Sequence, residues 1–237
     1  MKIGLIGYGK MGQAIEAIAK KRGHVISKII DLKNMEELSQ LTPNNTDVVI
    51  EFSTPQTAFN NISNCLEQGL PIISGTTGWL DQLPVVEALC RQKNGTFLST
   101  TNFSLGVNIF LKLNEWLTKV MDQQPQYEVD IEEIHHLQKL DRPSGTAITL
   151  AYDIIKDHSK YENWSLDEIH SQTIKINSLR KPEVPGTHRV VYESTIDKIE
   201  IKHEAYSRAG FAEGAVLVAE WIQHKKGVLT MNDFINL

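Results

Sequence analysis

The sequence has few cysteines, no long apolar run and no excess of positive charge, and each of these absences argues against a class of protein. Only two of its 237 residues are cysteines, Cys65 and Cys90, and both fall in helical patterns, so we expect reduced thiols in a reducing compartment. No run approaches 18 apolar residues, and no signal-type segment follows Met1, so we expect a cytoplasmic protein without a membrane span. The 24 basic and 29 acidic side chains give a net charge of −5, which argues against nucleic acid or an anionic membrane as the main partner.

The composition is otherwise that of an ordinary globular chain. Apolar residues make up 41% of the sequence and charged residues 22%, which is enough to bury a core. The length is long for one compact domain and suits two small ones.

The N-terminal region has the pattern of a dinucleotide-binding fold. A short apolar strand over residues 2–6 precedes Gly7-Tyr8-Gly9-Lys10-Met11-Gly12, and an amphipathic helix follows. A second strand over residues 25–30 ends in Asp31, 19 residues beyond Gly12, close to the spacing at which a carboxylate holds the ribose hydroxyls of adenosine. The three glycines suit a tight turn, close approach to a pyrophosphate and helix–strand packing. The alternative is a glycine-rich turn retained for packing alone.

Strands and helices then alternate up to residue 105. Strands are predicted over residues 47–52, 71–74 and 96–99, with helices ending near residue 67 and over residues 83–93. Each strand closes on a polar loop: Ser53-Thr54-Pro55, Gly75-Thr76-Thr77-Gly78 and Thr100-Thr101-Asn102-Phe103. In a parallel sheet these loops share the carboxyl edge, where open α/β sheets bind ligands.

The remaining sequence predicts a second domain of α+β type. A helix is expected over residues 107–120, and strands over 127–134, 169–177, 190–196 and 198–206, with few helices between them. Residues 157–167 are polar and are interpreted as a surface connection. An apolar helix over residues 214–224, followed by Lys225-Lys226-Gly227, closes the pattern.

The most informative stretch is Glu133–Ala147, EIHHLQKLDRPSGTA. It lies between a predicted strand and a predicted helix, so Pro143-Ser144-Gly145-Thr146 opens a helix N-terminus whose free amides can hold an anion. With His136 and Lys139 alongside, we expect a small carboxylate ligand, and His135 or Lys139 can move a proton.

The His135–His136 pair has two other interpretations. Such a pair is often only a polar strand end. A zinc site is less favoured, because neighbouring strand residues point to opposite faces and no cysteine or third histidine lies at ligand spacing nearby. We therefore expect no metal.

The chain resembles the 4-hydroxy-tetrahydrodipicolinate reductase (dihydrodipicolinate reductase) family over nearly its full length. The most specific part of the resemblance is the Glu133–Ala147 stretch. The supporting motifs, in order, are the Gly7–Gly12 turn, Gly75–Gly78, NFSLG at 102–106, VPGTH at 184–188, and SR at 207–208 with FAEGA at 211–215.

The resemblance implies the reduction of a small cyclic dicarboxylate with NADH or NADPH in lysine and diaminopimelate biosynthesis. It implies a Rossmann-type parallel-sheet nucleotide domain (1–105 and 208–237), completed by the C-terminal segment, and a substrate-binding and oligomerisation domain (106–207) whose sheet builds a homotetramer. His135 would be the acid/base and Lys139 the proton donor. The substrate carboxylate would be held by His136, Ser144, Gly145 and Thr146. The cofactor would be lined by Gly7, Tyr8, Gly9, Lys10, Met11, Gly12, Asp31, Gly75, Thr76, Thr77, Thr100, Thr101, Asn102 and Phe103.

The sequence departs from the family pattern at two places. The segment of residues 32–46 is short for the family, which predicts a more open adenosine end. Arg142 replaces a small residue, which adds a cation beside the carboxylate site.

Two alternative functions remain open. The first is another nicotinamide-dependent oxidoreductase of similar architecture, which would not need the His135-His136-x-x-Lys139 pattern. The second is a non-catalytic dinucleotide sensor, which would need an output surface such as a basic recognition helix.

Overall fold

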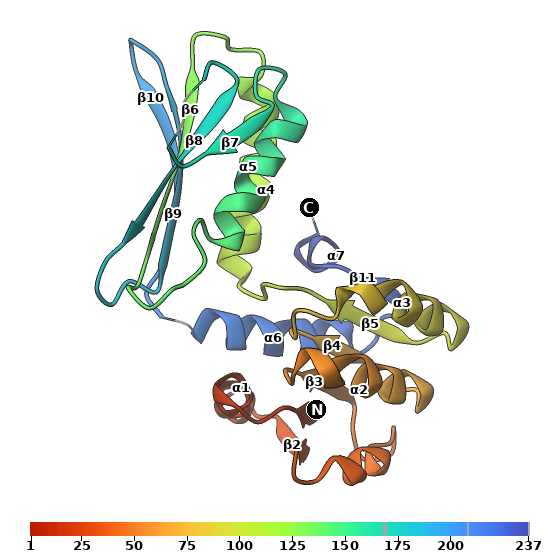
Figure 1. Cartoon of the computed structure of the whole chain (residues 1–237). Helices are drawn as coiled ribbons and strands as arrows, with labels where there is room; N and C mark the ends of the chain where they lie inside the picture. Colours follow the sequence, from red (N-terminus) through yellow and green to blue (C-terminus); the bar gives the residue numbers. More distant parts are fainter. Residues whose placement is uncertain (168–169, 208, 237) are drawn as a thin grey trace. The chain divides into compact units, whose positions relative to one another are not determined.

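The computed structural model describes residues 1–167, 170–207 and 209–236, and it divides into two compact units (Figure 1). Unit 1 comprises Met1–Leu105 and Ala209–Leu237, and unit 2 comprises Gly106–Arg208. None of the described helices has the length and apolar character needed to cross a bilayer.

Unit 1 is built on a parallel sheet of six strands, as the alternating strand and helix pattern predicts. In spatial order the strands are β11 (Gly227–Leu229), β5 (Thr96–Ser99), β4 (Ile72–Ser74), β3 (Val48–Glu51), β1 (Lys2–Ile6) and β2 (Val25–Ile30). The switch from β1–β2 to β3–β5 gives the doubly wound topology in which ligands bind at the carboxyl edge.

Helices cover both faces of this sheet, which explains why its strands are almost continuously apolar. On one face, Ile15 of α1 (Lys10–Lys21) and Val216 of α6 (Ala209–Ile222) belong to one core cluster. On the other face, Ile62 of α2 (Pro55–Glu67) and Val86 of α3 (Leu83–Gln92) belong to a second. The short 3-10 helices η1 (Met35–Gln40) and η2 (Leu80–Gln82) complete the connections. Cys65 and Cys90 are buried free thiols, as expected.

The C-terminal segment differs from the sequence-based expectation. Helix α6 begins five residues earlier than predicted, and residues 227–235 form strand β11 and helix α7 (Met231–Ile235), neither of which was predicted. Both are short, and β11 is stable only because it pairs with β5 at the sheet edge. A three-residue strand of this kind carries no periodicity of its own.

Unit 2 is a mixed sheet of five strands with two helices. The spatial order is β10 (Lys198–Ala205), β9 (Gly186–Glu193), β6 (Glu128–His135), β8 (Thr173–Arg180) and β7 (Asn163–Ser165). Strand β9 pairs antiparallel with β6 and β10, whereas β8 pairs parallel with β6 and β7. The α+β prediction for this region is confirmed.

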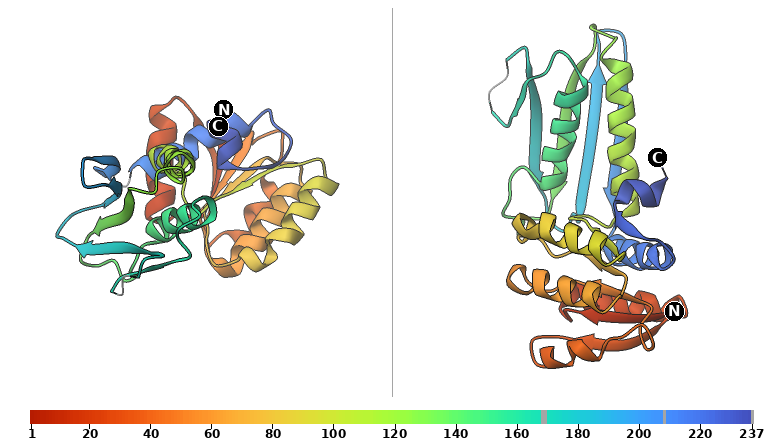
Figure 2. Two further views of the ribbon diagram at one scale, coloured as in Figure 1. Left: turned by 90° about the horizontal axis from the view of Figure 1, so that it is seen from above. Right: turned by 90° about the vertical axis from the view of Figure 1, so that its right-hand side faces the viewer.

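Helices α4 (Leu105–Met121) and α5 (Gly145–Asp157) lie on the same face of this sheet (Figure 2). Side chains on a strand alternate between faces, so Val129, Ile131, Glu133 and His135 of β6 all point to the helix-covered face, and all four are buried. The two polar residues therefore continue a core stripe. This alternation positions the site.

Three expectations for unit 2 need correction. The polar block 157–167 is not only a connection, since it contains β7. Strand β8 begins at Thr173; of the strand predicted over residues 169–177, Ile169 lies outside the described residues. The strand predicted over residues 190–196 is β9, which runs from Gly186 to Glu193 and so begins four residues earlier.

Candidate active site

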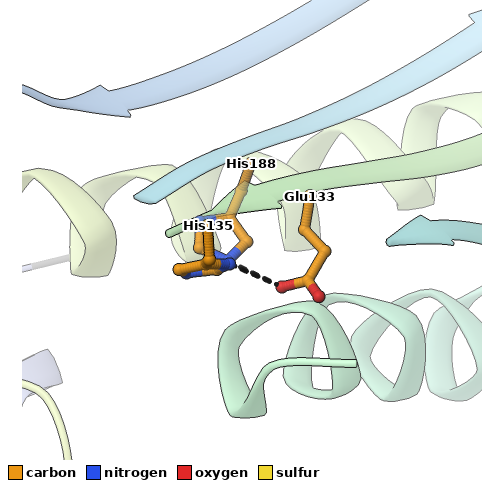
Figure 3. A group of neighbouring side chains, drawn as sticks. All are labelled: Glu133, His135 and His188. Atoms are coloured by element: carbon orange, nitrogen blue, oxygen red, sulfur yellow. Dashed lines mark ion pairs between the residues drawn. The ribbon is translucent and has the colours of Figure 1, made fainter. Parts of the chain in front are cut away.

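The polar cluster of unit 2 lies where β6 ends and α5 begins. Glu133 and His135 come from β6, and His188 comes from the neighbouring strand β9 (Figure 3). Ser144 is the N-cap of α5. The pleat explains the grouping, because all three strand residues point to the face that α5 covers. Glu133 is 0% exposed, and the other three side chains are buried as well.

Glu133 is the centre of this cluster. Its Oε1 accepts hydrogen bonds from the amide of Ser144 at 3.1 Å, from Arg180 at 3.1 Å and from the hydroxyl of Ser178. Its Oε2 lies 3.0 Å from Nδ1 of His135, the ion pair drawn in Figure 3. Burial alone would raise the pKa of Glu133, but the ion pair with His135 and the hydrogen bonds from Ser144 and Ser178 outweigh it and hold the pKa well below its ordinary value. The carboxylate is therefore ionised.

The two histidine rings of the cluster are in contact but play different parts. Their centroids are 5.0 Å apart in an edge-to-face arrangement. Burial, followed by the neighbouring charge of His135, lowers the pKa of His188 to about 3, so this ring stays neutral at physiological pH. Gly186 leaves room for the other ring, because a Cβ there would lie 3.1 Å from Nε2 of His135.

The N-terminus of α5 is tied to the same cluster. Ser144 Oγ accepts the amide of Ala147 at 3.3 Å, a helix N-cap, and lies 3.0 Å from Nε2 of His188. Gly145 and Thr146, the first residues of α5, have no carbonyl four residues earlier within the helix to accept their amide protons. A Cβ built on Gly145 meets no atom within 4 Å, so this glycine is not required by packing. The turn has the donors and the space that a carboxylate needs.

The loop between β6 and this turn contains His136, Lys139 and Arg142. Lys139 Nζ pairs with both carboxylate oxygens of Asp141 at 2.8 and 2.7 Å, and His136 is half-buried just beyond β6. Arg142 donates to the carbonyl of Ser178 at 2.9 Å, so its guanidinium is partly engaged by the backbone.

Arg180 is a further cation, one that the sequence did not indicate. It donates to Glu133 and, at 2.6 Å, to the carbonyl oxygen of Asp141, which fixes the loop between β6 and α5.

The cluster also contains residue types that bind metals. Ligand atoms of Glu133, His135 and His188 lie within 4.8 Å of one another. The absence of a third histidine near His135 in the sequence led to the expectation of no metal site. His188 lies 44 residues beyond Ser144 in the sequence, and the pairing of β9 with β6 brings it next to His135. The guanidinium of Arg180, 3.1 Å from the same carboxylate, already supplies positive charge, and Ser144 already occupies Nε2 of His188. The carboxylate and one of the two imidazoles thus already have partners within the protein.

The glycine turn of unit 1 has the geometry of a dinucleotide site. Gly7 has φ +89, and a Cβ on it would lie 2.0 Å from the carbonyl oxygen of Phe52. A Cβ on Gly12 would lie 2.2 Å from the carbonyl oxygen of Gly7, whereas a Cβ on Gly9 meets nothing within 4 Å. The first and third glycines are therefore fixed by packing, and the second leaves its side open for a ligand.

A cavity of about 370 Å³ adjoins this turn. Its walls include Gly7, Tyr8, Gly9, Asp31 and Lys33, together with the loop Phe52–Thr54. Asp31 is half-buried at the end of β2, and its Oδ1 accepts the amide of Lys33 at 2.7 Å. The cavity, the open glycine and the carboxylate fit the ribose end of a dinucleotide.

The other predicted cofactor residues are arranged along the same carboxyl edge but do not line this cavity. Lys10 and Met11 open α1, with Met11 packed against the core. The loop Gly75–Thr77 follows β4, and the loop Thr100–Phe103 follows β5 beside it, with the Thr100 amide donating to Ser74 at 3.1 Å.

Two of the side chains expected to line the cofactor, those of Thr76 and Phe103, are buried. The hydroxyl of Thr76 is buried and bonded to Glu51, whereas the neighbouring Thr77 is exposed. The ring of Phe103 lies in the core against Phe52, with centroids 5.6 Å apart.

Comparisons with known proteins bear on both units. The family model described as "Dihydrodipicolinate reductase, N-terminus" matches residues 1–103, and that described as "Dihydrodipicolinate reductase, C-terminus" matches residues 106–235. A curated 4-hydroxy-tetrahydrodipicolinate reductase from Christiangramia forsetii is 50% identical over 236 residues, which cover 100% of this chain and 98% of that protein.

Two solved structures share the fold at lower identity. A dipicolinate-bound dihydrodipicolinate reductase from Paenisporosarcina sp. TG-14 superposes with a TM-score of 0.83 at 21% identity, covering 99% of each chain. Aspartate dehydrogenase from Thermotoga maritima gives a TM-score of 0.52 at 13% identity, covering 95% of this chain and 97% of that one. The second likeness shows that the two-unit architecture alone does not select a substrate.

Proposed function

The chain belongs to the dihydrodipicolinate reductase family, and from that premise we propose how its residues divide the work of the reaction. The chain reduces 4-hydroxy-tetrahydrodipicolinate to tetrahydrodipicolinate in lysine biosynthesis, with NADH or NADPH as cofactor. The observation that carries the division is the buried cluster of Glu133, His135, His188 and Ser144, which joins an acid/base candidate to a helix N-terminus.

The first task is to hold a substrate carboxylate. We assign it to the amides of Gly145 and Thr146 and the hydroxyl of Ser144, at the positive end of the α5 dipole, with His136 beside them. Support comes from the open space over Gly145 and from the buried frame beneath the turn, in which Glu133 fixes the Ser144 amide and His188 contacts the Ser144 hydroxyl. Donors held in this way bind the charge with little reorganisation.

The second task is to supply a proton, which we assign to His135 and Lys139. The ionised Glu133 lies against Nδ1 of His135, which orients the ring and leaves Nε2 as the ring atom that can exchange a proton with the substrate. Lys139 is held at the rim by Asp141 and would leave that carboxylate for the substrate. The nicotinamide cofactor supplies the hydride when bound.

The third task, cofactor binding, is assigned to unit 1. Gly9 would allow the pyrophosphate to approach the backbone, and Asp31 would accept hydrogen bonds from the ribose hydroxyls. The loops Gly75–Thr77 and Thr100–Phe103 would line the rest of the cofactor. Because Thr76 and Phe103 are buried, their part would be through the backbone.

We further propose that the chain forms a homotetramer through the sheet of unit 2. Among the described residues no helix covers the face opposite α4 and α5 (Figure 2). That face carries a row of charges of both signs, in which Arg189 contacts Glu132 at 3.5 Å and Glu200 at 3.2 Å. Light scattering coupled to gel filtration would test this; a monomer mass at micromolar concentration would refute it.

The division of roles is tested by the kinetics of Lys139→Ala. Loss of a charge-assisted contact worth about 1.5–3 kcal/mol should lower kcat/KM about tenfold to a hundredfold, with the NADH dissociation constant nearly unchanged. The matched control is Lys119→Ala, which removes an exposed lysine of the same unit that pairs with Asp157 at 3.6 Å. Kinetics within twofold of the parent would remove Lys139 from the reaction.

A further inference from the structure

Glu51 is a second fully buried carboxylate, and it takes no part in the substrate, proton or cofactor roles proposed above. It is the last residue of β3 and is 0% exposed. No ion pair of Glu51 with a lysine, arginine or histidine occurs within residues 1–167, 170–207 and 209–236. A buried carboxylate without a cation is costly unless hydrogen bonds satisfy it, so its donors identify what it holds in place.

Four donors converge on the Glu51 carboxylate. Its Oε1 accepts the Ser53 amide at 2.9 Å, the Thr76 hydroxyl at 2.9 Å and the Ser53 hydroxyl, and its Oε2 accepts the Ser74 hydroxyl at 2.5 Å. The Ser53 amide also reaches Oγ1 of Thr76 at 2.9 Å. These donors belong to the loop after β3 and to β4 with the loop after it, so one carboxylate ties two adjacent segments of the carboxyl edge together.

The tied loop forms a wall of the cavity beside the glycine turn. Phe52, Ser53 and Thr54 line that cavity together with Gly9 and Asp31.

The loop after β3 is closely packed on two sides at Phe52. A Cβ on Gly7 would lie 2.0 Å from the Phe52 carbonyl oxygen, and a Cβ on Gly75 would lie 2.1 Å from the Phe52 ring. Ser53 itself is held by Thr57 and Asn61, which contact its hydroxyl at 3.0 and 3.1 Å, and by the Glu51 carboxylate, which accepts both its amide and its hydroxyl.

We propose that Glu51 is a positioning residue of the cofactor site: by accepting hydrogen bonds from Ser53, Ser74 and Thr76, it holds the wall of the dinucleotide cavity in the shape that binds NADH. This inference rests on the placement of the cofactor in that cavity proposed above. The two carboxylate oxygens of Glu51 act as acceptors for all four donors, so each donor points toward this side chain. These hydrogen bonds hold the loop after β3 and the loop after β4 in a fixed position relative to each other.

The test compares two substitutions of equal length at this position. Glu51→Gln keeps an oxygen that can accept the three donors of Oε1, and Ser74 can rotate to accept from the amide nitrogen. Glu51→Met keeps the volume and removes every acceptor. The dissociation constant of NADH is measured by calorimetry on the full chain, without substrate. We expect Glu51→Met to raise it about tenfold or more and Glu51→Gln to stay within about threefold of the parent.

The control separates positioning from a general loss of stability. Thr96 is also buried in the unit 1 sheet, at the amino end of β5, where its hydroxyl donates to the carbonyl of Lys225 at 2.5 Å. Thr96→Val should lower Tm and leave the NADH dissociation constant unchanged. Equal NADH affinity for the parent and Glu51→Met would overturn the proposal, as would an equal loss of affinity in Thr96→Val at matched Tm.

Two further variants keep the result decisive. If Glu51→Met does not fold, Ser74→Ala leaves Oε2 of Glu51 without its donor and should raise the NADH dissociation constant at least about threefold; no change overturns the proposal. Gly9→Val fills the open side of the turn and tests the cofactor placement itself. NADH binding that is unaltered in Gly9→Val refutes the placement, whereas binding lost in Gly9→Val but unaltered in the Glu51 variants refutes only the role of Glu51.

Discussion

Nδ1 of His135 lies 3.0 Å from Oε2 of Glu133, and the other oxygen of the same carboxylate accepts the amide of Ser144 at the start of α5. One buried anion therefore orients the acid/base candidate and fixes the carboxylate-binding turn. This arrangement requires Glu133 and His135 to lie two residues apart on a single strand, so that both point to the face that α5 covers.

The first prediction concerns the charge of Glu133. Glu133→Gln should lower kcat/KM about tenfold to a hundredfold, because His135 loses its anionic partner. It should also lower the free energy of unfolding by up to roughly 3 kcal/mol, because Arg180 is left without its carboxylate. The matched control is Glu132→Gln, the next residue of the strand, which points to the opposite face. Equal kinetics for the two variants would contradict the role given to Glu133.

The second prediction is a dependence of stability on pH that His188 produces. Burial lowers the pKa of this histidine to about 3, below its ordinary value of 6.5, so the unfolded chain binds a proton that the folded chain does not. The free energy of unfolding therefore does not depend on His188 above pH 6.5. Below that pH it falls as the pH falls toward 3, by at most about 1.4 kcal/mol per pH unit. His188→Gln should flatten the slope of unfolding free energy between pH 4.5 and 6, measured by urea denaturation.

The control for His188 is an exposed histidine. His224→Gln removes a side chain on the surface of unit 1 and should leave the slope as in the parent. If both variants keep the parent slope, His188 is not held neutral by the fold.

The third prediction concerns Gly145. A Cβ there meets no protein atom within 4 Å, and alanine favours the helix, so Gly145→Ala should fold with unchanged or slightly raised Tm. If a substrate carboxylate approaches the backbone at this point, KM for the substrate should nevertheless rise about tenfold or more. A variant with unchanged KM would remove Gly145 from the carboxylate site, and a loss of folding would show that the glycine is structural.

The fourth prediction is cofactor preference. Asp31 lines the cavity and would repel a 2′-phosphate, whereas Lys10 and Lys33 are exposed and screened, so NADH should be used as well as NADPH or better. Asp31→Ser should shift the ratio of kcat/KM values toward NADPH. Measuring both cofactors at low and moderate salt checks this. A parent that strongly prefers NADPH, or a ratio that Asp31→Ser leaves unaltered, would place Asp31 away from the ribose.

Much of the fold could be predicted because its local patterns agree with its tertiary structure. The strand over residues 96–99 was predicted at its observed bounds, since apolar residues between polar turns specify it locally. The strand predicted over residues 127–134 lies at Glu128–His135, and the helix predicted to open in the Pro143–Thr146 turn begins there, at Gly145. Strands β7 and β11 were missed, because three residues gain stability only from the neighbour with which they pair.

The site was predicted only as far as it is contiguous in sequence. His135, Lys139 and Ser144 were selected from one stretch, but their partners Arg180 and His188 arrive from β8 and β9 through sheet register. The sequence does contain a signal for His188, since it is the last residue of the VPGTH motif at 184–188, which contributes to the family resemblance. Glu51 had none, since a lone carboxylate at the end of a strand resembles any polar strand end.

The most direct test of the central claim is the rate of NADH oxidation, followed at the reduced-nicotinamide absorbance band, with 4-hydroxy-tetrahydrodipicolinate generated in situ. The purified chain should oxidise NADH only while that substrate is supplied, and His135→Gln should lower kcat/KM about a hundredfold. No oxidation above the rate without enzyme, or an equal rate in His135→Gln, would contradict the account.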